Sequence, residues 1–305
     1  MNLQNIKDDI SVRLHGYNFN VEIANACPCR CPSCPTGNYK KGDGTLMSFE
    51  QFTAILDAAQ KRFIIRRFAP YLGGDPMLHP ELPRFIREVK KRGIFVMFSS
   101  TFNKCIPDLE EVMASGIDDM RISWSGFTHY EEHHRGGNLK VVLENFYRIS
   151  RFKIKPKKIT LLFHRYKDNA DEEADGRALA DRLGFGFDPF GAQFLTLEKL
   201  MTPLLLTDED SKTIAGLCHD PWEYAYHSRG QRNCYYQRKC IQVDVHGQIM
   251  LCCRLRYPEY SLGDFLTSDF KATRRAVLGH KFCRRCLGSG LSQYAVIRDS
   301  SLRGT

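Results

Sequence analysis

The chain has 305 residues, of which 43% are hydrophobic and 26% charged, and its formal net charge is +9. These values are typical of a soluble globular protein with one large domain and an appendage, or with two modest domains. The N-terminus is polar and lacks the apolar stretch of a signal peptide, and the longest aliphatic runs are far too short to span a bilayer. We therefore expect a cytoplasmic protein without membrane contact.

Basic residues gather in short clusters at 40–41, 90–92, 153–158 and 284–285. Each cluster is most simply a solvated surface. Their functional interpretation is attraction to an anionic small-molecule substrate or to an acidic reductant of the flavodoxin or ferredoxin type. No aromatic-interleaved basic motif supports nucleic-acid binding, so we expect no nucleic-acid partner.

The twelve cysteines are unevenly distributed along the chain. Four lie between Cys27 and Cys34, seven lie between Cys218 and Cys286, and only Cys105 lies between the two groups. In a reducing compartment, such groups favour metal ligands or catalytic thiols over disulfides.

Residues 17–190 alternate between strand and helix patterns. Strands are predicted near 17–23, 68–72, 94–100, 120–125, 159–165 and 185–190, and Ser48 and Asn138 are predicted to cap two of the intervening helices. This alternation indicates an α/β fold in which a parallel sheet is covered by helices. We expect an N-terminal extension at 1–14, a partial (β/α)6 barrel at 15–200, and a small metal-organised domain at 201–305.

The first cysteine group contains a CxxxCxxC motif formed by Cys27, Cys31 and Cys34. Three thiolates can hold three irons of a [4Fe–4S] cube and leave the fourth iron open for another ligand. The alternative is a zinc site with Cys29 as fourth ligand, but four cysteines so close in sequence would be cramped around one tetrahedral ion.

The motif and its setting resemble the radical SAM superfamily, whose members use such a cluster and S-adenosylmethionine (SAM) to generate a 5′-deoxyadenosyl radical. The resemblance implies SAM contacts from three segments and one arginine: Gly73, Gly74 and Asp75; Thr101 and Asn103; Ser123 and Ser125; and Arg135. The chain departs from the family pattern in three places. Asp75 stands where glutamate is common, Ser33 replaces a frequent aromatic residue, and Cys29 is an extra thiol.

The second cysteine group resembles the SPASM/twitch extensions of that superfamily, in their shorter twitch form. Gly247 to Cys252 reads GxxxxC, and Cys283 and Cys286 form CxxC. The resemblance implies an auxiliary [4Fe–4S] cluster bound by four cysteines, Cys234, Cys252, Cys283 and Cys286. Cys240 is an alternative to Cys234, and a zinc knuckle built from the same thiols is an alternative to the cluster.

Three cysteines of this group remain unassigned: Cys218, Cys240 and Cys253. A free cysteine often packs as a small apolar residue. The alternative is a hydrogen-atom donor, and Cys253 is the candidate catalytic residue because it adjoins the predicted ligand Cys252.

Twitch enzymes include dehydrogenases and epimerases of sugar or aminocyclitol carbons, as well as peptide-modifying maturases. Maturases often carry a leader-binding domain before the barrel, whereas fewer than thirty residues precede Cys27 here. We therefore predict radical C–H activation of a small hydroxylated substrate, and the spare thiols favour epimerisation. The alternatives are a dehydrogenase that oxidises a secondary alcohol, a peptide (RiPP) maturase, and a non-catalytic iron–sulfur or zinc module, which would not bind SAM.

Overall fold

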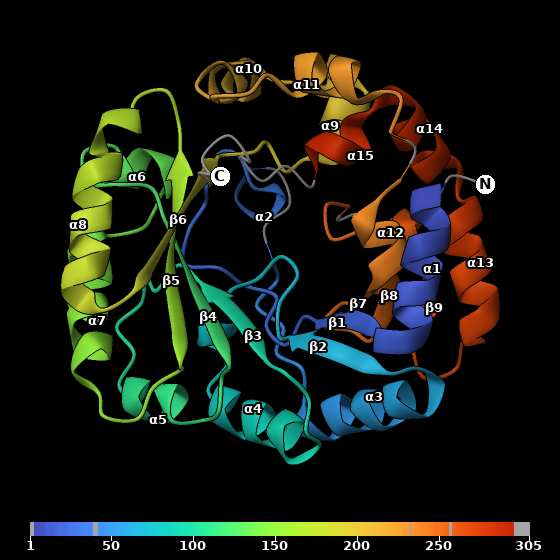
Figure 1. Cartoon of the computed structure of the whole chain (residues 1–305), viewed down its shortest axis with the longest axis horizontal. Coiled ribbons are helices and arrows are strands. Elements are labelled where there is room, and N and C mark those ends of the chain that lie inside the picture. The colour runs from blue at the N-terminus through green and yellow to red at the C-terminus, as the bar shows by residue number, and fades with distance from the viewer. Residues whose placement is uncertain (1–2, 39–41, 232, 256–257, 296–305) are drawn as a thin grey trace.

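The computed structural model describes residues 3–38, 42–231, 233–255 and 258–295. The strands line the inside of an open, ring-like arrangement, and helices cover its outside (Figure 1). One sheet has the order β3-β4-β5-β6 and the other has the order β2-β1-β7-β8-β9. An isolated parallel bridge between Phe68 and Val96 joins the two sheets at β2 and β3. The result is the partial barrel predicted from the sequence.

Six parallel strands form the barrel wall, and five main helices follow them on the outside. The strands are β1 (Tyr17–Val21), β2 (Ile65–Ala69), β3 (Met97–Ser100), β4 (Asp119–Trp124), β5 (Lys158–Arg165) and β6 (Gly186–Gly191). The helices are α3 (Phe49–Arg62), α4 (Leu82–Lys91), α5 (Leu109–Met113), α7 (Leu139–Arg151) and α8 (Glu173–Leu183). Short helices α2 (Pro35–Asn38) and α6 (Tyr130–His133) lie in loops after strands.

Local signals set most of the helix boundaries. The Ser48 hydroxyl accepts a hydrogen bond from the Gln51 amide at the start of α3, and the Asn138 side chain accepts one from the Val141 amide at the start of α7. Gly184 ends α8 with a φ of 71°, which is a left-handed conformation that glycine adopts without strain. The caps at Ser48 and Asn138 confirm the helix starts predicted from the sequence.

Two sequence expectations differ from the structure. The strand expected near 68–72 lies three residues earlier, at Ile65–Ala69. Pro70 follows it directly, and proline has no amide hydrogen to continue the ladder. The predicted N-terminal extension is largely a helix, α1 (Leu3–His15). This helix packs on α12 (Tyr235–Lys239) through an ion pair between Asp8 and Lys239.

The C-terminal region begins by extending the barrel sheet. Strand β7 (Cys240–Val243) pairs in parallel with β1, and β8 (Gln248–Met250) and β9 (Ser261–Asp264) continue it in antiparallel pairing. Ile241 and Val243 belong to the same hydrophobic core as Phe19 of β1. A second core, which includes Phe194, Leu251 and Phe282, lies under the remaining helices.

Most of these helices span the opening of the ring between β6 and the C-terminal strands in Figure 1. The remaining helices are α9 (Leu197–Met201), α10 (Asp208–Ala215), α11 (Pro221–Ser228), α13 (Phe270–Gly279), α14 (Lys281–Ser289) and α15 (Leu291–Tyr294). Of all the helices in the described part of the chain, none has the length and apolar character needed to cross a membrane.

Candidate active site

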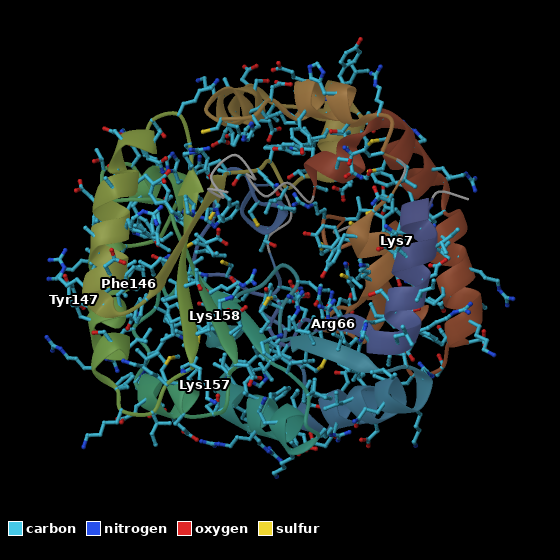
Figure 2. The ribbon with its side chains drawn as sticks, viewed as in Figure 1. Lys7, Arg66, Phe146, Tyr147, Lys157 and Lys158 are labelled. Carbon is cyan, nitrogen blue, oxygen red and sulfur yellow. The ribbon has the colours of Figure 1, made fainter. Side chains whose placement is uncertain are left out.

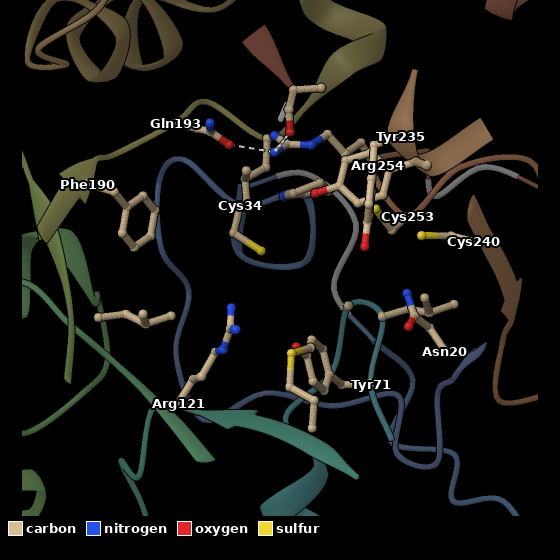
Figure 3. A pocket seen from close by; sticks show the side chains of 18 of the residues that line it. Asn20, Cys34, Tyr71, Arg121, Phe190, Gln193, Tyr235, Cys240, Cys253 and Arg254 are labelled. Carbon is tan, nitrogen blue, oxygen red and sulfur yellow. Dashed lines mark hydrogen bonds between the residues drawn. The ribbon is translucent and has the colours of Figure 1, made fainter. Parts of the chain in front are cut away.

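A cavity of about 790 Å³ lies inside the barrel, a size typical of small-molecule binding sites. The alternation of side chains along each pleated strand determines which residues line this cavity. On β4, for example, Met120 and Ile122 pack into the core, whereas Arg121 between them faces the cavity. Figure 3 shows Cys34, Tyr71, Arg121 and Cys253 around this space. The cavity therefore joins residues from the first cysteine loop, the barrel strands and the C-terminal region.

The first cysteine loop follows β1 and leads into α2. The Cys34 amide donates to the Cys31 carbonyl at 3.1 Å, and the Cys34 side chain lines the cavity. A hydrogen bond with Cys29, together with burial, raises the pKa of the Cys27 thiol. Cys29 is buried, and its sulfur lies 3.9 Å from the Thr101 hydroxyl. Three thiols on one short loop, with one of them facing the cavity, suit a cluster whose open iron binds a ligand there.

Glu22 anchors the glycine-rich segment, a role that the sequence analysis missed. Its carboxylate accepts hydrogen bonds from the amides of Gly73 and Gly74, both at 2.9 Å. Gly74 also approaches the segment after β1 closely, because a Cβ atom there would lie 1.8 Å from the Ala24 carbonyl oxygen. The signal in the sequence was a lone acidic residue between the apolar residues Val21 and Ile23.

The carboxylate of Asp75 connects this segment to the end of β3. Oδ2 accepts hydrogen bonds from the Ser100 hydroxyl at 2.9 Å and from the Thr101 amide and hydroxyl at 3.1 and 3.0 Å. Oδ1 accepts one from the Met77 amide at 3.1 Å. Burial raises the pKa of Asp75, and these hydrogen bonds oppose that shift. Asp75 thus holds two predicted SAM-binding segments against each other.

We expect Asp75→Ala to lower the free energy of unfolding by about 2–3 kcal/mol, because it strips acceptors from buried donors. It should also weaken SAM binding by roughly tenfold, since the two segments lose their connection. Thermal unfolding and equilibrium SAM binding check this, with iron content expected to stay constant. Asp175→Ala, at an exposed position on α8, is the matched control. Unchanged SAM affinity would show that the segment does not form the SAM site.

The polar segment after β3 contains a backbone conformation that non-glycine residues rarely adopt, with Phe102 at a φ of 53°. Next to it, the side chain of Asn103 makes two hydrogen bonds. Its Nδ2 donates to the Tyr130 hydroxyl at 2.6 Å, and its Oδ1 accepts from the Asn138 backbone amide at 2.8 Å. Thr101 and Asn103 therefore have fixed orientations.

The two predicted serines lie on or just after β4. Ser123 is half-buried, and Ser125 is fully buried with its hydroxyl 3.0 Å from Nδ1 of His134. Arg135 is less favourably oriented, because its half-exposed guanidinium pairs with Glu209 of α10. A role toward the SAM carboxylate would require Arg135 to leave that ion pair.

The structure brings the four predicted auxiliary ligands together. Cys234, Cys252, Cys283 and Cys286 all line a second, small cavity, with apolar partners such as Leu251 and Phe282. Burial raises the pKa of Cys234 to about 11 and that of Cys283 to about 12. In the described part of the chain, no three His, Cys, Asp or Glu side chains converge closely enough to hold a single metal ion.

The remaining cysteines lie apart from this small cavity. Cys240 and Cys253 line the barrel cavity, where Figure 3 shows them on one side of it. Cys218 points instead to the carbonyl of Arg165, with a sulfur–oxygen distance of 3.5 Å. The adjacent residues Cys252 and Cys253 therefore line different cavities: Cys252 lines the small cavity, and Cys253 lines the barrel cavity.

Three arginines of the cavity wall were not identified from the sequence: Arg67, Arg121 and Arg254. Tyr71 lies near Arg67 and Arg121, and burial raises its pKa to about 12 although these two arginines act in the opposite direction. The hydroxyl of Tyr71 therefore remains a neutral hydrogen-bond donor at physiological pH. The only available signal was the alternation of each strand, which places Arg67 and Arg121 at inward positions.

Comparisons with known proteins identify the family and the fold of this chain. The family model of the radical SAM superfamily matches residues 21–175. The chain is 34% identical over 102 residues to a tungsten-containing aldehyde ferredoxin oxidoreductase cofactor-modifying protein of Pyrococcus furiosus, which covers 32% of this chain and 28% of that relative. It is 25% identical over 104 residues to a PqqA peptide cyclase of Granulibacter bethesdensis, covering 34% of this chain and 27% of that relative. The chain thus matches less than a third of the length of either curated relative.

Among solved structures, Streptococcus suis SuiB bound to the precursor peptide SuiA is similar over 95% of this chain and 74% of that one. The TM-score is 0.62 and the sequence identity is 13%. At this identity the likeness shows the fold.

Proposed function

This chain belongs to the radical SAM superfamily, and on that premise we propose which residues carry its chemistry and what they act on. As a radical SAM enzyme it uses a [4Fe–4S] cluster and SAM. We assign the cluster to Cys27, Cys31 and Cys34, because their loop borders the barrel cavity through Cys34. Bound together, the reduced cluster and SAM supply a 5′-deoxyadenosyl radical that removes a hydrogen atom from a substrate carbon.

SAM is proposed to lie beside the segments at Gly73–Asp75, Thr101–Asn103 and Ser123–Ser125. Glu22 and Asp75 position the first two of these segments through the hydrogen bonds described above. Gly73 also lines the cavity next to the cysteine loop. SAM bound there would lie beside the space in which a substrate can bind.

A second [4Fe–4S] cluster is proposed at Cys234, Cys252, Cys283 and Cys286. Their shared cavity supports this assignment, and so does the position of Cys240, which lines the barrel cavity instead. Iron is preferred over zinc because the same chain carries radical SAM chemistry, whose auxiliary domains use iron–sulfur clusters.

The finer function that we propose is epimerisation of a carbon in a small hydroxylated substrate, such as a sugar or cyclitol. The observation that carries it is that Cys253 lines the same cavity as Cys34. A thiol in that wall can give a hydrogen atom to the substrate radical. Delivery to the face opposite the one that lost hydrogen inverts the carbon without net oxidation.

The step balances with a reductant of the flavodoxin or ferredoxin class. The substrate carbon loses a hydrogen atom to the 5′-deoxyadenosyl radical and gains one from the S–H bond of Cys253. One electron and one proton then restore the Cys253 thiol. A second electron supports each cleavage of SAM, so two electrons enter per turnover.

Peptide modification is the second candidate, because a curated relative is a peptide cyclase and the similar SuiB structure holds a precursor peptide. A dehydrogenase is the third candidate: the substrate radical would lose an electron and a proton, and a cluster held by Cys234, Cys252, Cys283 and Cys286 would accept the electron. Anaerobic turnover with panels of hydroxylated compounds and peptides, followed by mass spectrometry, separates them. An epimer keeps the substrate mass, a dehydrogenated product is lighter by two hydrogens, and a peptide substrate would show a modified peptide.

The positive surface predicts a salt-dependent encounter with an acidic reductant. Basic residues such as Arg66 and Lys157 are exposed (Figure 2). We expect reduction by a flavodoxin to slow by roughly tenfold as ionic strength rises from about 0.05 to 0.5 M, because salt screens the attraction. Stopped-flow absorbance measures this rate, and reduced methyl viologen, which is a small cation, is the control. A rate that does not change with salt would leave the basic surface without this role.

A further inference from the structure

Inward side chains give the barrel cavity a positive lining. Each of the six barrel strands contributes one or more residues to it, including Asn20, Arg67, Met97, Arg121, Leu162 and Asp188 from β1 to β6 in order. Arg254 from the C-terminal region adds a third guanidinium. Among the described lining residues, Asp188 is the only carboxylate. Arg121 is paired with Asp119, whereas a neutral sugar would offer no negative charge to Arg67 or Arg254.

Two of these arginines, Arg67 and Arg254, have incomplete hydrogen bonding. The Nε atom of Arg67 is buried without a hydrogen-bond partner in the described part of the chain, and so is Nη1 of Arg254. Arg121 donates from Nε and Nη2 to Asp119, at 3.3 and 3.1 Å. Burying a guanidinium with unpaired N–H groups costs free energy, and an oxyanion would supply the missing acceptors.

Arg67, Arg121 and Tyr71 lie around one part of the cavity. All three residues line the cavity, and both guanidinium groups act electrostatically on the Tyr71 hydroxyl, where the Asp119 carboxylate and the Cys253 thiol oppose them. Figure 3 shows Arg121 extending from β4 into the cavity near Tyr71. Arginine presents N–H groups in a planar fork that matches carboxylate or phosphate oxygens, and the phenol adds one more donor.

This group lies deeper in the barrel than the segments proposed for SAM. Arg67 is inside β2, whereas Gly73 and Gly74 follow the end of that strand at Ala69. Along β4, Arg121 precedes Ser123 by two residues and Ser125 by four, which corresponds to about 7 and 13 Å along the strand. An anion held by Arg67 and Arg121 would therefore lie on the N-terminal side of the predicted SAM contacts, with Ser123 the nearest of them on β4.

We propose that Arg67, Arg121 and Tyr71 form an oxyanion site that binds a carboxylate or phosphate group of the substrate. The inference rests on the proposed function in one respect, namely that the substrate shares this cavity with SAM. It narrows the substrate class to small hydroxylated compounds that carry an acidic group. The site orients the substrate from its charged end, so that the reacting carbon lies toward Cys34 and SAM.

The test uses the reconstituted, SAM-loaded protein and two simple probes, inorganic phosphate and malonate, at constant ionic strength. Isothermal titration calorimetry should show saturable binding of at least one probe to the wild-type protein. Arg67→Gln and Arg121→Gln should each weaken that binding by roughly 10- to 100-fold, and Arg67→Lys should weaken it less. Arg66→Gln removes the same charge from the exposed face of the same strand and should bind as wild type does. Equal affinity in all variants, or no saturable binding, overturns the proposal.

Two further measurements identify the ligand of the site. Affinity for SAM, and reductive cleavage of SAM to 5′-deoxyadenosine without substrate, should remain within about twofold in Arg67→Gln and Arg121→Gln. A parallel loss of SAM affinity would assign the arginines to the SAM carboxylate and overturn the proposal. Failure of the wild-type protein to cleave SAM would instead count against the proposed function, while the probe titration would still report on the oxyanion site. Each variant should keep the iron content and the unfolding temperature of the wild-type protein, which shows that it is folded.

Discussion

Cys253→Ala is expected to stop formation of the epimer while the enzyme still cleaves SAM and abstracts hydrogen. The variant removes the proposed hydrogen donor from the cavity wall but leaves the cysteines of both cluster sites in place. Turnover to the inverted product should fall by roughly 100-fold or more, a loss comparable to that of a positioned proton donor in other enzymes. Mass spectrometry and NMR of the product, with 5′-deoxyadenosine measured in parallel, check both halves of this expectation.

Solvent deuterium identifies the donor more directly. Thiol hydrogens exchange with water, so the wild-type enzyme in D₂O should place one deuterium at the inverted carbon. Cys218→Ala is the matched control, because Cys218 contacts the Arg165 carbonyl and does not line the barrel cavity. Cys240→Ala tests the other spare thiol that lines the cavity. A product lighter by two hydrogens, without deuterium at carbon and insensitive to Cys253, would refute epimerisation and favour the dehydrogenase.

The second prediction with a large expected effect concerns the two proposed cluster sites. Anaerobically reconstituted protein should hold about eight irons, four per cluster. Replacing Cys27, Cys31 and Cys34 together by alanine should lower the content to about four irons and abolish reductive cleavage of SAM. Replacing Cys283 and Cys286 should also leave about four irons, because the first site keeps its three thiols. Iron analysis and Mössbauer spectra of the variants measure the outcome.

Cys29→Ala is the control for the first site, since Cys29 lies in the same loop but outside the CxxxCxxC motif. It should keep about eight irons and cleave SAM. Loss of the first cluster in that variant would show that Cys29 replaces one of the three predicted ligands. Stoichiometric zinc with no iron at the later site would contradict the auxiliary cluster.

Patterns between near neighbours in the chain predicted the barrel well. The strand–helix alternation, the caps at Ser48 and Asn138 and the glycine that ends α8 depend on residues within a few positions of one another. The CxxxCxxC spacing is equally local, because three ligands on one loop need no other part of the fold. These features could therefore be predicted from the amino-acid sequence alone.

Contacts between distant residues required the tertiary structure. The parallel pairing of β7 with β1 joins segments more than 200 residues apart, and no local pattern encodes that register. The anchoring of Gly73 and Gly74 by Glu22 likewise depends on β1 and β2 lying side by side. The predicted SAM segment could be found by resemblance, but the carboxylate that orients it could not.

Which cavity each of the later cysteines and the arginines lines also depends on the tertiary structure. The sequence by itself determined that Cys252 and Cys253 are adjacent, and that Arg67 and Arg121 lie on strands. The curvature of the strands into a partial barrel places both arginines at the wall of one cavity. The chain at Cys252 and Cys253 passes between two cavities, so each thiol faces a different one. The physical reason is that strand pleating sets only which residues share a face. What that face encloses depends on every strand and helix packed around it.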